Sequence, residues 1–151
     1  MLDGIDKNIL RCLQRDGRLS QLELADEVGL SPTPCARRVK KLEADGYIRG
    51  YTALISEDKL GFGFSIFVSV RLDKQIDDRL VTFEEAVARY QEVVDCWLMT
   101  GGFDYLLRIA VSDLHEFERF LTRKLTKIEG VASIESSIPL RRVKESVARL
   151  V

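Results

Sequence analysis

Basic side chains gather in one short stretch of this chain of 151 residues. Between residues 31 and 50, five lysines and arginines stand against two acidic residues, Glu43 and Asp45, so the stretch carries a net charge of +3. The whole chain carries −1, and the remaining residues therefore carry −4. A local basic patch on a weakly acidic protein is typical of a surface that meets a phosphate backbone, although a solvated helix face also produces such a run.

Two short helices are predicted before this stretch. Apolar residues recur at helical spacing between residues 5 and 13, behind Asp3, which is a favourable N-cap. Ser20 and Glu23 have the Ser-x-x-Glu form of a capping box, in which hydroxyl and carboxylate each accept a backbone N–H. This box predicts a second helix that ends near Gly29.

A third helix is predicted within the basic stretch itself. Ser31 offers a capping hydroxyl, Pro32 suits the first helical position, and the pattern ends near Asp45. At the helical period, an apolar stripe that includes Cys35 faces a core, so we interpret Cys35 as a core residue. The opposite face is polar and cationic, with Arg38 on its flank, and consists of Thr33, Arg37, Lys40 and Lys41.

Only Gly29 and Leu30 separate the second and third helices, which matches the helix-turn-helix arrangement. The second helix of that motif enters the DNA major groove, where its first residues reach base edges and later ones reach phosphates. The start of the preceding helix can offer backbone N–H groups to a phosphate. The predicted contacts to double-stranded DNA are Ser20, Gln21, Ser31, Thr33, Pro34, Arg37, Arg38, Lys40 and Lys41.

The pattern then changes from helical to mixed. Residues 48–55 are predicted to form a strand, and residues 56–63 a polar connection marked by glycine. Beyond them, alternating and helical spacings follow in the order β-α-β-β-α-β, which is that of a ferredoxin-like domain. We expect an α+β protein with a winged-type helix-turn-helix domain at residues 1–50, a strand and linker at 51–63, and the ferredoxin-like domain at 64–151.

The two middle strands of this second domain are apolar in both phases. Such strands need cover on both faces of the sheet, and a second subunit would supply it. We therefore expect self-association through the sheet. The two phases, grouped by their spacing, are Val94, Cys96, Leu98, Leu106 and Ala110 on one side, and Trp97, Met99, Leu107, Ile109 and Val111 on the other.

A glycine-containing loop joins these two strands. Glycines let backbone N–H groups converge on a ligand carboxylate, while Asp104 could accept a ligand ammonium group. Two adjacent glycines are also what a simple hairpin turn requires, and both interpretations stay open. The candidate effector-binding residues are Thr100, Gly101, Gly102, Phe103 and Asp104.

Several segments together resemble one known family. They are Leu2-Asp3 with Asp6 and Ile9-Leu10, Asp16-Gly17-Arg18, the string from Val28 to Cys35 with Arg38-Val39 and Leu42-Glu43, Gly46 with Ile48, Gly50-Tyr51, and the later Cys96 to Tyr105 followed by Gly130-Val131. The sequence resembles the Lrp/AsnC, or feast/famine, transcriptional regulators over nearly its whole length. The string from residue 28 to residue 42 carries most of this resemblance.

The resemblance implies a DNA-binding regulator whose effector is a small molecule, usually an amino acid. It also implies a dimer built through the ferredoxin-like sheets, often assembled into tetramers or octamers, that binds pseudo-palindromic promoter sites. Effectors of such regulators bind between dimers. This chain has Gly102-Phe103 where many relatives carry polar residues, so the identity of the effector stays open.

Other functions have little support in the sequence. The chain has one histidine, His115, and three widely spaced cysteines, so we predict no catalytic or metal site and no disulfide scaffold or cofactor. No apolar run is long enough for a membrane helix, and we expect a cytoplasmic protein. Two alternatives remain, a DNA-bending protein that ignores small molecules and an amino-acid sensor that docks on a metabolic enzyme.

Overall fold

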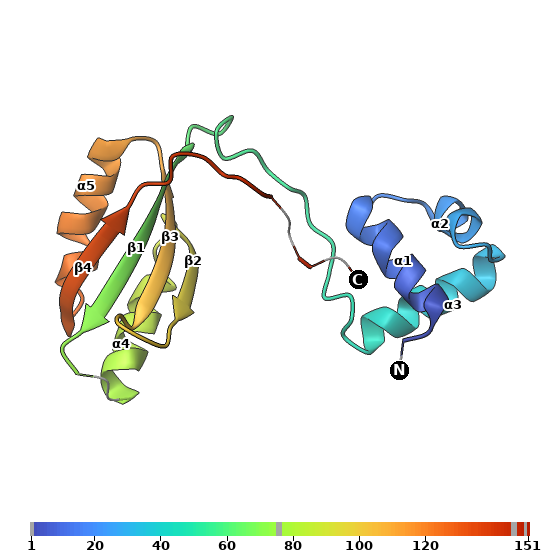
Figure 1. Ribbon diagram of the computed structural model, residues 1–151, viewed down its shortest axis with the longest axis horizontal. Helices are drawn as coiled ribbons and strands as arrows, with labels where there is room; N and C mark the ends of the chain where they lie inside the picture. Colours follow the sequence, from blue (N-terminus) through green and yellow to red (C-terminus); the bar gives the residue numbers. More distant parts are fainter. Residues whose placement is uncertain (1, 75–76, 146–147, 150) are drawn as a thin grey trace. The chain divides into compact units, whose positions relative to one another are not determined.

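The computed structural model describes residues 2–74, 77–145, 148–149 and 151, and its chain forms two compact units. The first comprises Met1–Leu54 together with Lys144–Val151, and the second comprises Ile55–Val143. Helices alone build the first unit, whereas a sheet with helices builds the second, as Figure 1 shows. This is the expected α+β class.

The first unit contains three helices: α1 (Gly4–Arg15), α2 (Gln21–Glu27) and α3 (Pro32–Ala44). Asp3 is the N-cap of α1 and Ser20 forms the capping box of α2, as predicted, and the structure adds a second capping box between Asp3 and Asp6. The expected cap from Ser31 is wrong, because its side chain makes no capping hydrogen bond. An N-cap hydroxyl accepts from the second or third N–H of a helix, and here the third residue, Pro34, has none.

A small core holds the three helices together. Ile9 and Leu10 of α1 pack with Leu24 of α2 and with Cys35 of α3. Cys35 is buried, which confirms that it is a core residue. Gly29 adopts a φ of 68°, a left-handed conformation that glycine accepts without strain and that permits the tight connection from α2 to α3.

The last described residues of the chain also contact this unit. The side-chain amide of Gln14 donates to the carbonyl of Arg149 (3.0 Å) and accepts from the N–H of Val151 (3.2 Å). Arg11 Nε donates to the carbonyl of Val151 (2.8 Å). These hydrogen bonds explain why Lys144–Val151 groups with the helices of the first unit.

The second unit has the predicted β-α-β-β-α-β order. Its elements are β1 (Phe64–Leu72), α4 (Asp77–Val87), β2 (Val93–Leu98), β3 (Tyr105–Val111), α5 (Leu114–Arg123), a 3₁₀ turn (Leu125–Lys127) and β4 (Val131–Ser137). The strands lie in the order β2-β3-β1-β4, and every neighbouring pair is antiparallel. Phe83 of α4 and Phe120 of α5 belong to one core with the inward side chains of the sheet, so both helices cover the same face.

The opposite, outer face of the sheet is mixed in character. The register places Trp97, Leu106, Ser69 and Glu135 in one row across the four strands. The phases expected from the sequence are therefore wrong, because beyond the irregularity at residues 93–95 this hairpin pairs odd-numbered residues of β2 with even-numbered residues of β3. Leu107 faces the helices, whereas Trp97 and Leu106 share the outer face with polar neighbours.

The connection between the units differs from the expected strand over residues 48–55. Residues 49–56 have no regular secondary structure, and a turn follows at residues 57–61. A strand needs a neighbour for its hydrogen bonds, and Leu54 and Ile55 stay exposed instead. No helix in the described part of the chain is long and apolar enough to cross a membrane.

Candidate nucleic-acid interface and ligand loop

The outer face of α3 and the start of α2 together form a groove of about 380 Å³. The groove contains four of the nine predicted DNA contacts, Gln21, Thr33, Arg37 and Lys40. Pro32 and Ala36 complete its lining. The structure therefore brings polar and cationic side chains from two helices to one concave surface.

Helical geometry explains this arrangement. Thr33, Arg37 and Lys40 follow one another at intervals of three or four residues, so they share one face of α3. The opposite face carries Cys35 and Leu42 into the core. Neither Arg37 nor Lys40 forms an ion pair with any described residue, and both side chains are exposed. Their charges are available to a polyanion.

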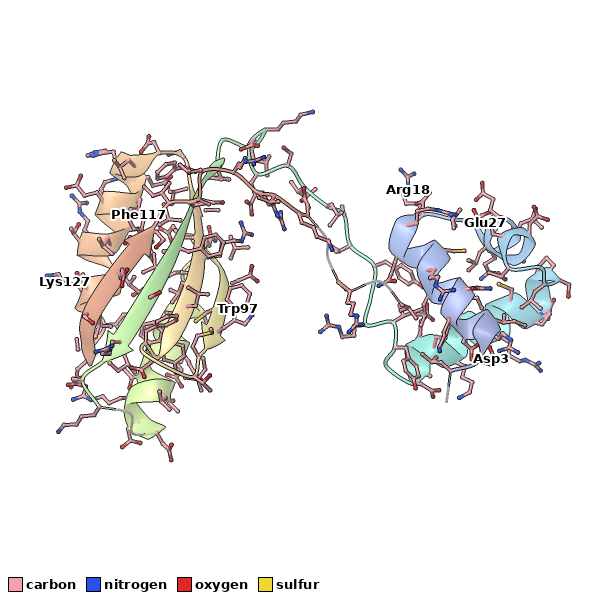
Figure 2. All side chains as sticks on the ribbon, viewed as in Figure 1. Asp3, Arg18, Glu27, Trp97, Phe117 and Lys127 are labelled. Carbon is pink, nitrogen blue, oxygen red and sulfur yellow. The ribbon has the colours of Figure 1, made fainter. Side chains whose placement is uncertain are left out.

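Arg38, the next predicted contact, is held by α1. Its Nη1 lies 2.7 Å from Asp3 Oδ2 and 2.7 Å from Asp6 Oδ1. The backbone N–H of Asp6 and then the Arg38 guanidinium lower the pKa of Asp3, so this carboxyl stays ionised beside the arginine. Figure 2 labels Asp3 at the end of α1 where this contact forms. Arg38 thus fastens α3 to α1.

Lys41 has a partner as well. Its Nζ lies 2.6 Å from Asp45 Oδ2, one helical turn further along, and this pairing is the main reason why the pKa of Lys41 is raised. The predicted cations therefore fall into two pairs. Arg37 and Lys40 have no carboxylate partner in the described chain. Arg38 has two such partners and Lys41 has one.

The remaining predicted contacts lie beside the groove without lining it. Ser20 uses its hydroxyl to accept from the N–H of Glu23 (3.2 Å), within the capping box of α2. Ser31 is exposed at the start of α3 with no capping bond, and Pro34 is half-buried. Of the two serines, Ser31 has the hydroxyl that the helix leaves available.

The loop between β2 and β3 contains the candidate effector residues. Thr100, Gly101 and Gly102 are exposed and Phe103 is half-buried, whereas Asp104 is only 3% exposed. Asp104 Oδ2 accepts from the N–H of Leu72 (2.7 Å), and its own N–H donates to the carbonyl of Val70 (2.9 Å). Asp104 thus pins the loop to β1, beside the irregularity at residues 71–72.

Arg71 lies next to this loop and was missed by the sequence analysis. Its guanidinium donates to the carbonyl of Gly102, and the side chain is exposed. It forms no ion pair with any described residue. The sequence did contain a clue to Arg71. The outward-facing residues of β1 are Ser65, Phe67, Ser69 and Arg71, and Arg71 is the one cation among them.

His115, the one histidine of the chain, lies on the surface of α5. The His115 ring lies 3.6 Å from Glu118, and both side chains are largely exposed. In the described part of the chain, no group of three or more histidine, cysteine, aspartate and glutamate side chains could hold a metal ion.

Two protein families match this chain, one over the unit that contains α3 and one over the unit that contains the loop. Residues 2–49 match the family described as winged helix-turn-helix DNA-binding, and residues 65–148 match the Lrp/AsnC ligand binding domain. These matches define a class of regulator in which a helix-turn-helix is joined to a separate ligand-binding domain. The chain belongs to the Lrp/AsnC family of transcriptional regulators.

Individual relatives share most of their length with this chain. It is 50% identical over 142 residues to the Bkd operon transcriptional regulator of Pseudomonas aeruginosa, covering 94% of this chain and 93% of that protein. It is 41% identical over 145 residues to the leucine-responsive regulatory protein of Escherichia coli K12, covering 96% and 88%. These relatives are named as regulators and not as enzymes.

Solved structures show the same similarity in three dimensions. A transcriptional regulator from Neisseria meningitidis, solved as a complex with L-Met, has a TM-score of 0.93 at 37% identity, covering 97% of this chain and 95% of that one. An AsnC family regulator from Agrobacterium tumefaciens has a TM-score of 0.92 at 38% identity, covering 98% and 96%. The arrangement of helices and strands described above is therefore that of the family.

Proposed function

We propose that this regulator binds two-fold-symmetric duplex DNA through α3 as a dimer or larger closed assembly, and that an aliphatic amino acid modulates its affinity or assembly. The groove on α3 carries the proposal, because it exposes two cations without carboxylate partners at the start of a recognition helix. A two-fold DNA site requires a two-fold protein, and the outer face of the sheet is the surface for that contact.

Within the groove, the residues have different roles. Arg37 and Thr33 lie near the start of α3, where side chains reach base edges, and Arg37 can fork onto a guanine. Lys40 lies one turn further along and is suited to a phosphate, as is the N-terminal end of α2 at Gln21. Arg38 acts by positioning, because its two aspartates hold it against α1.

The loop at residues 100–104 with Arg71 is our proposed effector site. A zwitterionic amino acid needs a cation for its carboxylate, and the Arg71 guanidinium lies beside the exposed glycines. Asp104 holds the loop in place. One relative is named leucine-responsive and another was solved with L-Met, so leucine and methionine are the effectors to test first.

The cysteines suit this assignment to a regulator inside the cell. Cys12, Cys35 and Cys96 are all free thiols, and thiols persist in a reducing compartment. We therefore propose a cytoplasmic location, where both DNA and free amino acids are available to the protein.

The test is a titration of duplex DNA, selected from a random library by the protein itself, with and without leucine or methionine. We expect specific binding that one of the amino acids changes by about 5–150-fold, the usual range of allosteric coupling. Arg71→Gln keeps a hydrogen-bond donor for Gly102 but removes the charge, and should bind DNA normally with a weaker response.

Other outcomes would favour the alternatives. DNA binding with no response to any amino acid would indicate an architectural protein. A response in sedimentation to an amino acid, without any duplex binding, would indicate a sensor that docks on another protein. A normal response in Arg71→Gln would place the effector elsewhere in the domain.

A further inference from the structure

Arg108 stands on the outer face of the sheet with carboxylates from two different segments. Its Nη1 and Nη2 donate to the two oxygens of Glu57, at 2.9 and 3.0 Å, in a bidentate pair. Its Nε lies 3.3 Å from Asp95 on the neighbouring strand β2. The side chains of Arg108 and Glu57 are 23% and 38% exposed, so the pair is partly shielded, and its bidentate geometry is the stronger form of such a pair.

Glu57 does not belong to the sheet but to the linker turn. The N–H of Phe62 donates to its carbonyl (2.8 Å), and Leu60 N–H donates to the carbonyl of Ser56 (3.2 Å). Gly63 follows the turn. A glycine suits this position, because a Cβ there would clash with the carboxylate of Asp58. The turn is thus a closed unit, and the Glu57–Arg108 pair joins it to β3.

At its other end, the linker is fixed to the helices. The hydroxyl of Tyr51 donates to Glu43 of α3 (3.0 Å), and its ring packs close to Gly17. No hydrogen bond joins residues 52–55 to other described residues. Only these four residues lie between the contact at Tyr51 and the turn that starts at Ser56.

We infer that the Glu57–Arg108 pair anchors the linker to the ligand-binding domain, and so sets the spacing of DNA half-sites that the regulator accepts. The inference rests on the proposed binding of two half-sites by a dimer. Four extended residues reach at most about 14 Å, so an anchored linker limits the distance between the contact at Tyr51 and the turn that starts at Ser56. Half-sites lie about 34–36 Å apart along the duplex, or at multiples of that spacing.

Releasing the anchor lengthens the tether. The free segment grows from residues 52–55 to as much as residues 52–63, from four to twelve residues. Effective concentration falls roughly as the −3/2 power of linker length, so binding to two correctly spaced half-sites weakens by up to about fivefold. Binding to an isolated half-site does not depend on the tether and should stay unchanged.

The first test measures the anchor itself, by limited trypsin digestion of the full-length protein. Lys59 lies in the turn, and Arg49 precedes the linker and serves as an internal reference. Glu57→Ala should speed cleavage after Lys59 relative to Arg49. Asp95→Ala is the matched control, because it takes a carboxylate from the same arginine but leaves the linker contact intact.

The second test measures spacing. The probes are the duplex selected by the parent protein and the same duplex with about five base pairs, half a helical turn, inserted between its half-sites. The parent and Asp95→Ala should lose much affinity on insertion. Glu57→Ala should bind the original duplex about two- to fivefold more weakly, and should lose at least about twofold less on insertion.

Equal insertion penalties in the parent and Glu57→Ala would overturn the role in spacing, and equal effects of Glu57→Ala and Asp95→Ala would overturn the anchor. If the parent selects no duplex at all, the proposed function fails and the spacing role falls with it. The trypsin comparison would still decide whether the anchor exists. Unchanged sedimentation and thermal unfolding of both variants exclude a general loss of structure.

Discussion

Helix α3 and the loop at residues 100–104 are both candidate binding sites, yet they use their charged side chains differently. On α3, Arg37 and Lys40 point outward while another face of the same helix enters the core. In the loop, Asp104 is buried and holds the backbone of β1. A helix is stabilised by its own hydrogen bonds and can leave one face for a ligand, whereas a short loop needs a side chain to pin it.

Asp104→Ala should destabilise the protein more than any other substitution in these two regions. This change removes the acceptor of the buried Leu72 N–H, and a hydrogen bond to a charged group contributes about 1.5–3 kcal/mol. We expect a decrease of about 2–3 kcal/mol in the free energy of unfolding of the second unit, measured by urea denaturation.

Asp104→Asn is the control for this prediction, because an amide oxygen can still accept from Leu72. It should cost less than the alanine change. If Asp104→Ala unfolds like the parent and yet no longer responds to an amino acid, Asp104 contacts the ligand directly, as its position in a glycine loop first suggested, and the contrast with α3 disappears.

Periodic patterns made the helices and strands of this protein predictable. The N-cap at Asp3, the capping box at Ser20, the core position of Cys35 and the β-α-β-β-α-β order of the second unit all follow from local spacing. The cationic face of α3 was predictable for the same reason, because a helix repeats its orientation every three to four residues.

Several errors share a cause, which is contact between residues far apart in the sequence, whereas the missing Ser31 cap and the Lys41–Asp45 pair are local. The pairing of Arg38 with Asp3 and Asp6 spans more than thirty residues, and no local pattern announces it. Asp104 likewise finds its partner in Leu72, 32 positions earlier. Residues 48–55 have the local pattern of a strand, but no strand of the described chain pairs with them.

Substitutions of the neighbours Arg37 and Arg38 should have different effects, although both side chains belong to α3. Arg37→Ala should weaken binding to the selected duplex by about 1–3 kcal/mol and relax the preference at one base pair, if the contact is a bidentate one to guanine. Arg38→Ala should instead lower the thermal stability of the first unit, with a smaller change in affinity, because its charge is engaged by Asp3 and Asp6.

The measurement is a fluorescence anisotropy titration against the selected duplex and its single-base variants, with thermal unfolding in parallel. A loss of specificity in Arg38→Ala without loss of stability would show that Arg38 leaves its aspartates to read DNA. Equal behaviour of the two variants would remove the distinction between free and engaged cations.

The two serines at helix starts should differ in the same way. Ser20→Ala removes a capping hydroxyl and should cost about 1 kcal/mol of stability, whereas Ser31→Ala should cost almost nothing.

The contribution of the capping box should also depend on pH. Hydrogen bonds from Ser20 lower the pKa of Glu23, so the stabilisation by this ionised carboxylate is present near neutral pH and is lost as the pH falls through that lowered pKa. Urea denaturation at pH 7 and in acid should show the cost of Ser20→Ala shrinking. A large cost for Ser31→Ala would mean that its hydroxyl is used within the fold.

Lys40 and Lys41 should differ in a smaller quantity, the salt dependence of DNA binding. Each phosphate contact releases counterions and contributes about 0.9 to the slope of log K against log salt, so Lys40→Ala should reduce that slope by about one. Lys41 already has Asp45 at 2.6 Å, and binding a phosphate would require it to give up this partner. Lys41→Ala should therefore leave the slope nearly unchanged, although the sequence alone suggests a phosphate contact for both lysines.

Between 50 and 200 mM salt, one unit of slope changes affinity only about three- to fourfold, so the slope and not a single affinity must be measured. Asp45→Ala provides the decisive control, because freeing Lys41 should make the slope steeper if the partner is what withholds its charge from DNA. A slope that falls equally in Lys40→Ala and Lys41→Ala would mean that DNA outcompetes Asp45, and that ion pairs within the free protein do not determine which cations of α3 bind phosphate.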